Sequence, residues 1–309
     1  MSSITTDQGI VHYEVYGRGR PVILLHGYLG SWGLWQDTMN YLGRYYRTYA
    51  LDFWGFGESD AKRGNTFVVQ DFVGMVDQFM EQLGIVGAPL VGHSMGGTVS
   101  LAMAMQHPER VHKVVVIGSP IVGSSLSFLL QLFGIRPVGF VVYTNLWAFK
   151  LSYHLLAPFY SRDKTWTTMM DRDVSRTKLE AFFLSIGSLR QTDLRSSLNK
   201  IQVPVMGMYG PKDIVVHPAQ WKPLKQGVPH ARIEIFPEAG HFIMLDAPQR
   251  FKETLHDFLG TPISSPSPAG GASTGDQLPS APASPAAPVQ PPNSGPLSPS
   301  SSNQPQPPR

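Results

Sequence analysis

A serine set among closely spaced glycines is the clearest chemical feature of the sequence. Residues 92–97 are GHSMGG, which places Ser94 in a G-x-S-x-G pattern. The apolar pair Leu90-Val91 precedes this segment, and small and apolar residues follow it over 95–106. A nucleophile elbow needs this order, because a strand, a sharp turn and a helix expose the serine Oγ beside the positive end of the helix. The sequence therefore predicts that Ser94 is a nucleophile.

A serine nucleophile needs a base, and a third group must orient that base. Among the ten histidines, His241 is the best-placed base because it lies between the last predicted strand and the last predicted helix. Asp213 follows another late strand, 28 residues before His241. The order serine, acid, histidine fits an elbow serine, so Asp213 is the predicted acid. Asp52 is the second candidate, but the glycines that follow it favour a role in a turn.

Acyl transfer also needs two N–H donors for the oxyanion of the tetrahedral intermediate. The backbone N–H of Met95, directly after the nucleophile, is the first predicted donor. The second is the N–H of Tyr28, because the glycines of 26–30, HGYLG, let that loop curl under a substrate carbonyl. This chemistry requires neither a metal nor an organic cofactor, and we expect none.

Three further histidines receive structural interpretations. His93 neighbours the nucleophile, and we expect its side chain to point away from Ser94. His26 ends a predicted strand and is expected to shape the loop that follows. His217 stands directly before a proline and is expected to begin a helix.

Strands and helices must alternate along the chain to position these groups. Short apolar runs that end at glycine or proline indicate buried parallel strands; they are 22–25, 50–53, 90–91, 114–117, 205–209 and 233–236. Helical periodicity or composition marks the segments 67–83, 95–106 and 247–259. This alternation predicts an α/β fold with a doubly wound sheet and right-handed crossovers.

Residues 121–195 show no clear strand, and we expect a helical cap inserted in the core of 1–120 and 196–260. Its first part, 121–160, is apolar and aromatic, with only Arg136 and Lys150 charged. Long insertions on compact domains are often functional lids, although this one could simply cover the edge of the sheet. Contact of 126–160 with a membrane surface is a weaker alternative, because the same residues must also cover the sheet.

An apolar pocket would suit a hydrophobic ester. Its expected walls are Tyr28, Trp32, Met95, Val215 and Phe242 from the core, and Phe128, Phe133, Tyr143 and Trp147 from the cap. The alternative for the cap aromatics is plain packing of cap helices on the sheet.

Length and composition set the outer limits. Of the 309 residues, 261–309 contain 14 of the 27 prolines and no aromatic residue, so we expect a disordered tail, either passive or a tether. The remaining 260 residues suit one large domain. Cysteine is absent, which excludes disulfides and thiolate metal sites. A net charge of +3 gives no strong field for nucleic acid. The N-terminal segment lacks the pattern of a signal peptide, and we expect a cytoplasmic protein without a membrane span.

Together these motifs resemble the α/β-hydrolase superfamily, and within it the serine-nucleophile group of esterases, haloperoxidases and epoxide-hydrolase-like proteins. The resemblance covers about residues 9–260 and is carried by HGYLG at 26–30, DFWGFGES at 52–59, GHSMGG at 92–97, the Asp213 loop and Gly240-His241. It implies an eight-stranded, mostly parallel sheet, a helical cap after the sixth strand and a triad of Ser94, His241 and Asp213.

Departures from the relatives narrow the chemistry. Epoxide hydrolases and haloalkane dehalogenases of this fold use an aspartate nucleophile, whereas this chain has Ser94. The meta-cleavage C–C hydrolases usually carry asparagine before the serine and Gly-Pro-Gly in the oxyanion loop. Here those places hold His93 and 28–30, YLG.

The expected function is a serine hydrolase that cleaves a hydrophobic carboxylic ester through an acyl-enzyme on Ser94. An acyltransferase on the same triad is the first alternative, and a non-catalytic ligand receptor is the second. Aminopeptidase activity ranks lower, because the cap lacks an acidic cluster for an N-terminal amine. The expected partner is a small hydrophobic ester; the sequence does not predict an oligomeric state.

Overall fold

The structure is a computed structural model and describes residues 2–262. Of the tail predicted over 261–309, residues 263–309 lie outside the described range. The described residues belong to one compact unit, which includes both the sheet and the inserted helices.

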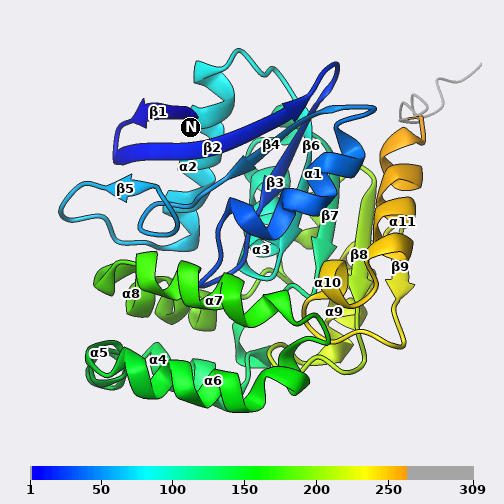
Figure 1. Ribbon diagram of the computed structural model, residues 1–309. Helices are drawn as coiled ribbons and strands as arrows, with labels where there is room; N and C mark the ends of the chain where they lie inside the picture. The colour runs from blue at the N-terminus through cyan, green and yellow to red at the C-terminus, as the bar shows by residue number, and fades with distance from the viewer. Residues whose placement is uncertain (1, 263–309) are drawn as a thin grey trace, which may run out of the picture. The chain divides into compact units, whose positions relative to one another are not determined.

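One sheet runs through the molecule in the strand order β1-β2-β4-β3-β6-β7-β8-β9 (Figure 1). Its strands are β1 (Ser2–Thr6), β2 (Gly9–Gly17), β3 (Pro21–Leu25), β4 (Arg47–Leu51), β6 (Ala88–His93), β7 (Val111–Ile117), β8 (Val205–Tyr209) and β9 (Arg232–Ile235). The two-residue strand β5 (Asp60–Ala61) pairs with β2 beside this path. β1 and β2 are antiparallel to their neighbours, and β4, β3 and β6 to β9 are parallel. The predicted eight-stranded, mostly parallel sheet is confirmed.

All six predicted strands occur, but β1, β2 and β5 were not predicted. β2 has the sequence GIVHYEVYG, in which polar and apolar residues mix, and β1 alternates between partly buried and exposed positions. Strands of this kind lie near a sheet edge with one face toward solvent, so they lack the continuous apolar run of a central parallel strand.

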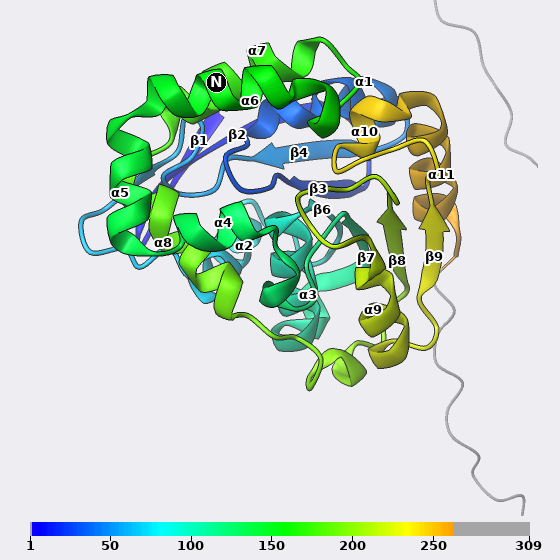
Figure 2. The same ribbon diagram turned by 90° about the horizontal axis from the view of Figure 1, so that it is seen from below.

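Helices cover both faces of the sheet (Figure 2). On one face lie α1 (Gln36–Leu42), α10 (Ile243–Asp246) and α11 (Pro248–Gly260), and on the other lie α2 (Val69–Gln82), α3 (Met95–Gln106) and α9 (Trp221–Gly227). In α2, Phe72, Val76 and Phe79 recur at steps of three and four and are fully buried. α3 is buried over 95–104, which explains its small and apolar composition.

The insertion between β7 and β8 carries five helices: α4 (Phe128–Phe133), α5 (Arg136–Thr144), α6 (Leu146–Tyr160), α7 (Thr165–Arg176) and α8 (Leu179–Gln191). They lie beyond the end of the sheet toward which the β9 arrow points, with α7 and α8 next to the core and α4 to α6 further out (Figure 1). A backbone hydrogen bond from Lys178 N to Gly55 O (2.8 Å) helps to fasten the inner layer. Within residues 2–262, no helix is both long enough and apolar enough to cross a membrane.

One glycine inside α2 and one just after it offer a test of local energetics. Gly74 lies inside the helix with open space where a Cβ would stand, and Gly84 follows the helix with equal space but a φ of +65°. We expect Gly74→Ala to stabilise the fold by about 0.5–1 kcal/mol, because alanine loses less backbone entropy in a helix. The matched change Gly84→Ala should destabilise it by about 1 kcal/mol, because alanine is strained at positive φ. Urea unfolding measures both, and equal effects of the two changes would contradict this account.

Candidate active site

Ser94 occupies the sharp turn between β6 and α3. Its backbone angles are φ 50° and ψ −118°, a conformation that side-chain-bearing residues rarely adopt. Its N–H donates to Ile117 O at 2.8 Å, which fixes the turn to β7. A Cβ at Gly92 would stand 2.2 Å from Gly96 O, and one at Gly96 would stand 2.3 Å from Leu25 O. Both positions therefore require glycine, as the elbow interpretation implies.

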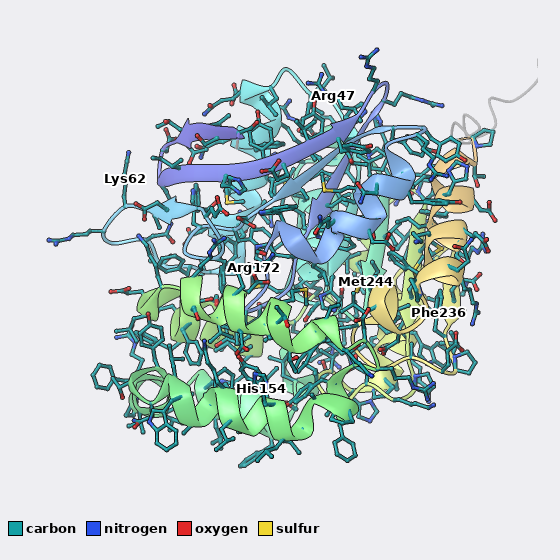
Figure 3. All side chains as sticks on the ribbon, in the orientation of Figure 1. Arg47, Lys62, His154, Arg172, Phe236 and Met244 are labelled. Atoms are coloured by element: carbon teal, nitrogen blue, oxygen red, sulfur yellow. The ribbon has the colours of Figure 1, made fainter. Side chains whose placement is uncertain are left out.

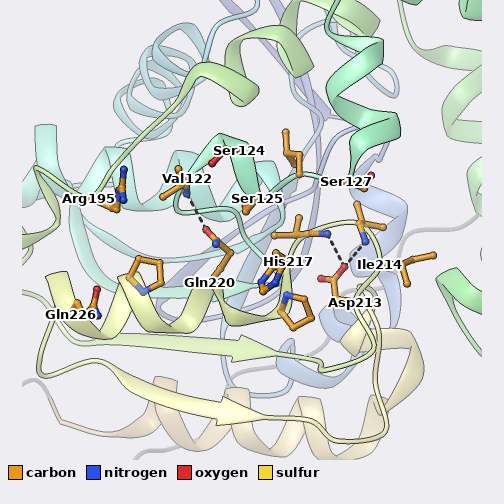
Figure 4. A pocket seen from close by; sticks show the side chains of 15 residues that line it. Val122, Ser124, Ser125, Ser127, Arg195, Asp213, Ile214, His217, Gln220 and Gln226 are labelled. Carbon is orange, nitrogen blue, oxygen red and sulfur yellow. Dashed lines mark hydrogen bonds between the residues drawn. The ribbon is translucent and has the colours of Figure 1, made fainter.

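A buried pair of side chains stands on the loops after β8 and β9. His241 Nδ1 lies 2.7 Å from Asp213 Oδ2, and both side chains are almost completely buried. The other oxygen, Asp213 Oδ1, accepts from the N–H groups of Val215 (2.8 Å) and Val216 (2.9 Å), as Figure 4 shows. An ionised carboxylate can only accept, so His241 carries its proton on Nδ1 and leaves Nε2 free to act as a base.

Ser94 and His241 line the same cavity beneath the cap, whose volume is about 90 Å³. Within the described residues no hydrogen bond joins Ser94 Oγ to His241 Nε2. Such bonds are often long without substrate and tighten in the substrate complex.

Gly118, the residue after β7, completes the support beneath the acid–histidine pair. It has a φ of +55°, and a Cβ there would stand 3.2 Å from His241 Nδ1 and 3.3 Å from Asp213 Oδ2. The sequence analysis did not single out this residue. The strand-ending GSP at 118–120 was its only signal.

The loop after β3 lies directly against the nucleophile. A Cβ at Gly27 would stand 3.0 Å from Ser94 Cβ, and Leu29 turns the loop with a φ of 56°. Among the hydrogen bonds of residues 2–262, the N–H groups of Tyr28 and Met95 have no acceptor. They are therefore available to a substrate oxygen, which is what an oxyanion hole needs.

Two cap helices hold this loop in place. The Tyr28 hydroxyl donates to Phe182 O in α8 at 2.6 Å, and burial raises the pKa of Tyr28 well above its usual value. Ser31 Oγ donates to Asp173 Oδ1 in α7 at 2.9 Å, and Arg172 Nε donates to the same oxygen at 2.7 Å. Figure 3 shows Arg172 between α7 and the core. Burial raises the pKa of Asp173 despite its bond to Arg172.

The sequence analysis gave Asp173 no role, because the spacing of a cap residue along the chain does not reveal which core loop it will meet.

The cavity wall agrees only in part with the prediction. Tyr28, Val215, Phe242 and Phe133 line it, together with cap residues that were not predicted, among them Phe149, Tyr153, Tyr160, Trp166 and Ile186. Met95 is fully buried and is not among the lining residues.

Phe128 and Trp147 were wrongly placed in the wall. Their side chains are 76% and 71% exposed, because they lie on the outer side of α4 and α6. The prediction for Trp32 was also wrong, because Trp32 is not among the lining residues. Its backbone N–H donates to Asp52 Oδ1 at 2.6 Å, and its ring centroid lies 6.5 Å from that of His12. Tyr143 is not a lining residue either, since its hydroxyl donates to Thr177 O within the cap.

His93 differs from its prediction, because its ring lines the cavity and lies 4.6 Å from that of His241. A carbonyl oxygen can only accept, so His93 Nε2 donates to His241 O at 3.1 Å. Burial and the neighbouring His241 lower the pKa of His93 well below its usual value. His93 is therefore neutral and supports the backbone of the histidine base.

The remaining predicted roles agree with the geometry. His26 Nε2 accepts from Phe53 N (2.9 Å) and its Nδ1 donates to Gly27 O (2.7 Å), so it shapes the loop. Burial lowers the pKa of His26. His217 begins the short 3₁₀ helix Pro218–Gln220 and accepts from Ala219 N.

The carboxylate of Asp52 already accepts hydrogen bonds from three other residues. It accepts from Trp32 N, from Glu58 N at 2.9 Å and from His12 Nδ1 at 2.9 Å, so it is not available as the acid for His241.

A larger groove of about 670 Å³ lies on the other side of the Asp213 loop (Figure 4). It is lined by residues such as Ser124, His217 and Gln220, and neither Ser94 nor His241 reaches it. We therefore assign the chemistry to the smaller cavity. Residues 2–262 hold no group of three or more acidic and histidine side chains placed to bind a metal ion.

Comparison with known proteins places this site in a family. A family model described as alpha/beta hydrolase fold matches residues 20–248. The chain therefore belongs to the alpha/beta hydrolase fold family.

Similar proteins are named as hydrolases and esterases. An uncharacterized hydrolase of Bacillus subtilis is 28% identical over 82% of this chain and 96% of its own length. A pimeloyl-(acyl-carrier protein) methyl ester esterase of Aeromonas hydrophila is 26% identical over 81% of this chain and 99% of its own. The solved structure of an esterase from Exiguobacterium antarcticum, 23% identical, shares the fold with a TM-score of 0.72 over 83% of this chain and 98% of that one.

The acid–histidine bond gives a first prediction for the site. Asp213→Asn should keep the loop but present an N–H to His241 Nδ1, which favours the wrong tautomer. We expect kcat for a soluble aryl ester to fall by on the order of 10³–10⁴, with little change in Tm. Asp193→Asn, an exposed aspartate of the cap paired with Arg195, is the matched control and should leave kcat unchanged. A kcat above one tenth of the parent's for Asp213→Asn would contradict the assignment.

The buried histidines give a second prediction, on stability against pH. The folded pKa of His93 is lowered, so the unfolded chain binds more protons as the pH falls below about 6.5, and stability is lost in that direction. His93→Gln keeps an N–H for His241 O and does not titrate. We expect the loss in unfolding free energy between pH 7.5 and 5.5 to shrink by about 1 kcal/mol in this variant. Urea unfolding at the two pH values measures it, and parallel profiles would show that His93 does not contribute.

Proposed function

We propose that the protein is a serine hydrolase that cleaves a hydrophobic carboxylic ester through an acyl-enzyme on Ser94. The observation that carries the proposal is the buried 2.7 Å bond between His241 and Asp213, because His241 lines the same cavity as the strained turn at Ser94. A nucleophile, an oriented base and free backbone donors in one enclosed place are the parts that acyl transfer requires.

In the first half of the reaction, His241 Nε2 takes the proton of Ser94 Oγ as that oxygen bonds to the ester carbonyl carbon. The electron pair of the C=O bond moves to the oxygen, which the N–H groups of Tyr28 and Met95 stabilise. Asp213 stabilises the imidazolium and holds its tautomer. The intermediate then collapses, the bond to the alcohol oxygen breaks, and His241 gives its proton to that oxygen.

In the second half, water occupies the place of the alcohol. His241 Nε2 takes a proton from the water as its oxygen attacks the acyl carbon, and the same N–H groups stabilise the second oxyanion. The bond to Ser94 Oγ breaks, Oγ regains the proton, and the carboxylic acid leaves.

The substrate class follows from the wall of the cavity. Phe133, Phe149 and Ile186 are apolar, as is Phe242 beside the histidine base. Such a wall favours an ester whose acyl part is hydrophobic. The cavity, about 90 Å³, is smaller than the pocket of a drug-sized ligand, so long esters require α4 and α6 to move apart. A relative named as a methyl ester esterase is consistent with this class.

A fluorophosphonate probe tests the proposal, with labelling measured by intact mass and peptide mapping. We expect one equivalent on Ser94 and none on Ser94→Ala. Ser124→Ala, an exposed serine of the neighbouring groove, is the matched control and should be labelled like the parent. A folded protein that takes no label on Ser94 would overturn the proposal and favour a non-catalytic ligand receptor.

An ester panel of increasing acyl length follows a positive label. Running it with and without a competing alcohol separates hydrolysis from acyl transfer, because a transferase would return a new ester rather than the acid.

A further inference from the structure

Large apolar side chains are exposed mainly on the outer layer of the cap. Of the sixteen exposed large hydrophobic residues in the described range, ten lie between 128 and 159. Leu129 also lines the Ser94 cavity. We call the other nine the outer cap face; they are Phe128, Ile135, Phe140, Val141, Trp147, Leu151, Leu155, Leu156 and Phe159. Exposed apolar side chains gathered on one layer of helices mark a binding face, since single exposed residues are normal but a cluster is not.

The helix α6 shows why this face calls for a partner. Trp147, Leu151, Leu155 and Phe159 follow one another at steps of four, so they form one stripe, and each is at least 53% exposed. Other residues of the same helix, among them Tyr153, line the Ser94 cavity. The helix is therefore apolar on both sides, and a helix of that kind is expected to be covered on both.

The charged residues around the outer cap face indicate which kind of partner it binds. From Arg110 to Arg162 the sequence contains no acidic residue. Arg136, at the start of α5, and Arg162 and Lys164, directly after α6, are exposed and form no ion pair within the described residues. The carboxylate between the last two, Asp163, accepts from Thr165.

At the other edge of α6, toward α7, the basic side chains already have an acidic partner. Lys150 and His154 both face Asp171, and Figure 3 shows His154 on α6 in the outer layer.

We propose that the outer cap face docks on the surface of an anionic lipid bilayer, with the apolar stripe of α6 in the acyl boundary and Arg136, Arg162 and Lys164 at the headgroups. Cations beside an apolar face are what an interfacial helix uses to bind anionic lipid. A two-fold pairing of the same face in a second copy would instead bring like charges together. In this arrangement α6 lies in the plane of the interface.

If the proposed function holds, the docked orientation would also mean that the ester substrate comes from the bilayer. The Ser94 cavity lies directly behind α6, so an ester dissolved in the bilayer could enter it when α4 and α6 part, without crossing water.

Cosedimentation of the full chain with vesicles tests the docking. The vesicles are phosphatidylcholine alone or phosphatidylcholine with phosphatidylglycerol at three to one. We expect binding to the anionic vesicles that weakens with salt, and at least tenfold weaker binding by the double variant Trp147→Ser, Leu155→Ser. The matched control is the double variant Val86→Ser, Ile10→Ser, which removes two exposed apolar side chains that lie outside the cap. It should bind like the parent.

Three results would overturn the docking: no binding of the parent to anionic vesicles, equal binding of the outer-face variant, or a dimer in light scattering that the same variant dissolves. The last would assign the face to a second copy. Ser94→Ala should bind vesicles like the parent. The test of docking is therefore independent of the proposed function. Failure of the proposed function would be seen as absence of the fluorophosphonate label.

Discussion

The left-handed turn at Ser94 is the constraint on which the site depends. A residue with a side chain is held at φ 50° only because β6, α3 and β7 surround it closely, with glycine at 92 and 96 where any Cβ would collide with backbone. The pairing of β3 with β6, with Leu25 opposite Gly92, then brings the end of β3 beside the turn. The loop at 27–30 therefore lies directly against Ser94.

His241 reaches the same cavity as Ser94 through the order of the strands in the sheet, not through proximity in the sequence. β7, β8 and β9 follow β6 in order, so their carboxyl ends lie side by side and each contributes one element of the site. Gly118 after β7 leaves room beneath the pair, Asp213 after β8 accepts three N–H groups, and His241 follows β9. His93 donates to the backbone of His241, so the elbow strand also supports the base that it faces.

The cap performs two physical tasks with two layers. Its inner helices fasten the loop after β3, through Tyr28 to α8 and through Ser31 and Asp173 to α7. Its outer helices close the cavity with one side and expose apolar residues with the other. The inner layer is held by buried polar bonds, whereas polar ties of the outer layer lie mostly at its edge with α7, at Asp171.

Much of this architecture follows from local sequence. The apolar runs ending at glycine or proline gave the central strands, because a strand buried on both faces has no polar positions. The segment GHSMGG predicted the turn at Ser94, because the need for glycine in that turn comes from residues close by in the sequence. The edge strands β1 and β2 escaped prediction because one side of each is partly exposed. Asp213 and His241 were predicted from the order serine, acid, histidine along the chain. That order is a property of the fold and not of the local sequence.

The parallel core and the residues at the ends of its strands could be predicted from the sequence, since they depend on periodicity and on near neighbours. The side of each cap helix that faces the cavity could not, because it depends on how the helices pack. Phe128 and Trp147 are as apolar as Phe133 and Phe149, yet the first two are exposed and the last two line the pocket. When a helix is apolar all round, its composition cannot say which side turns inward, and packing against α7 and α8 makes that choice.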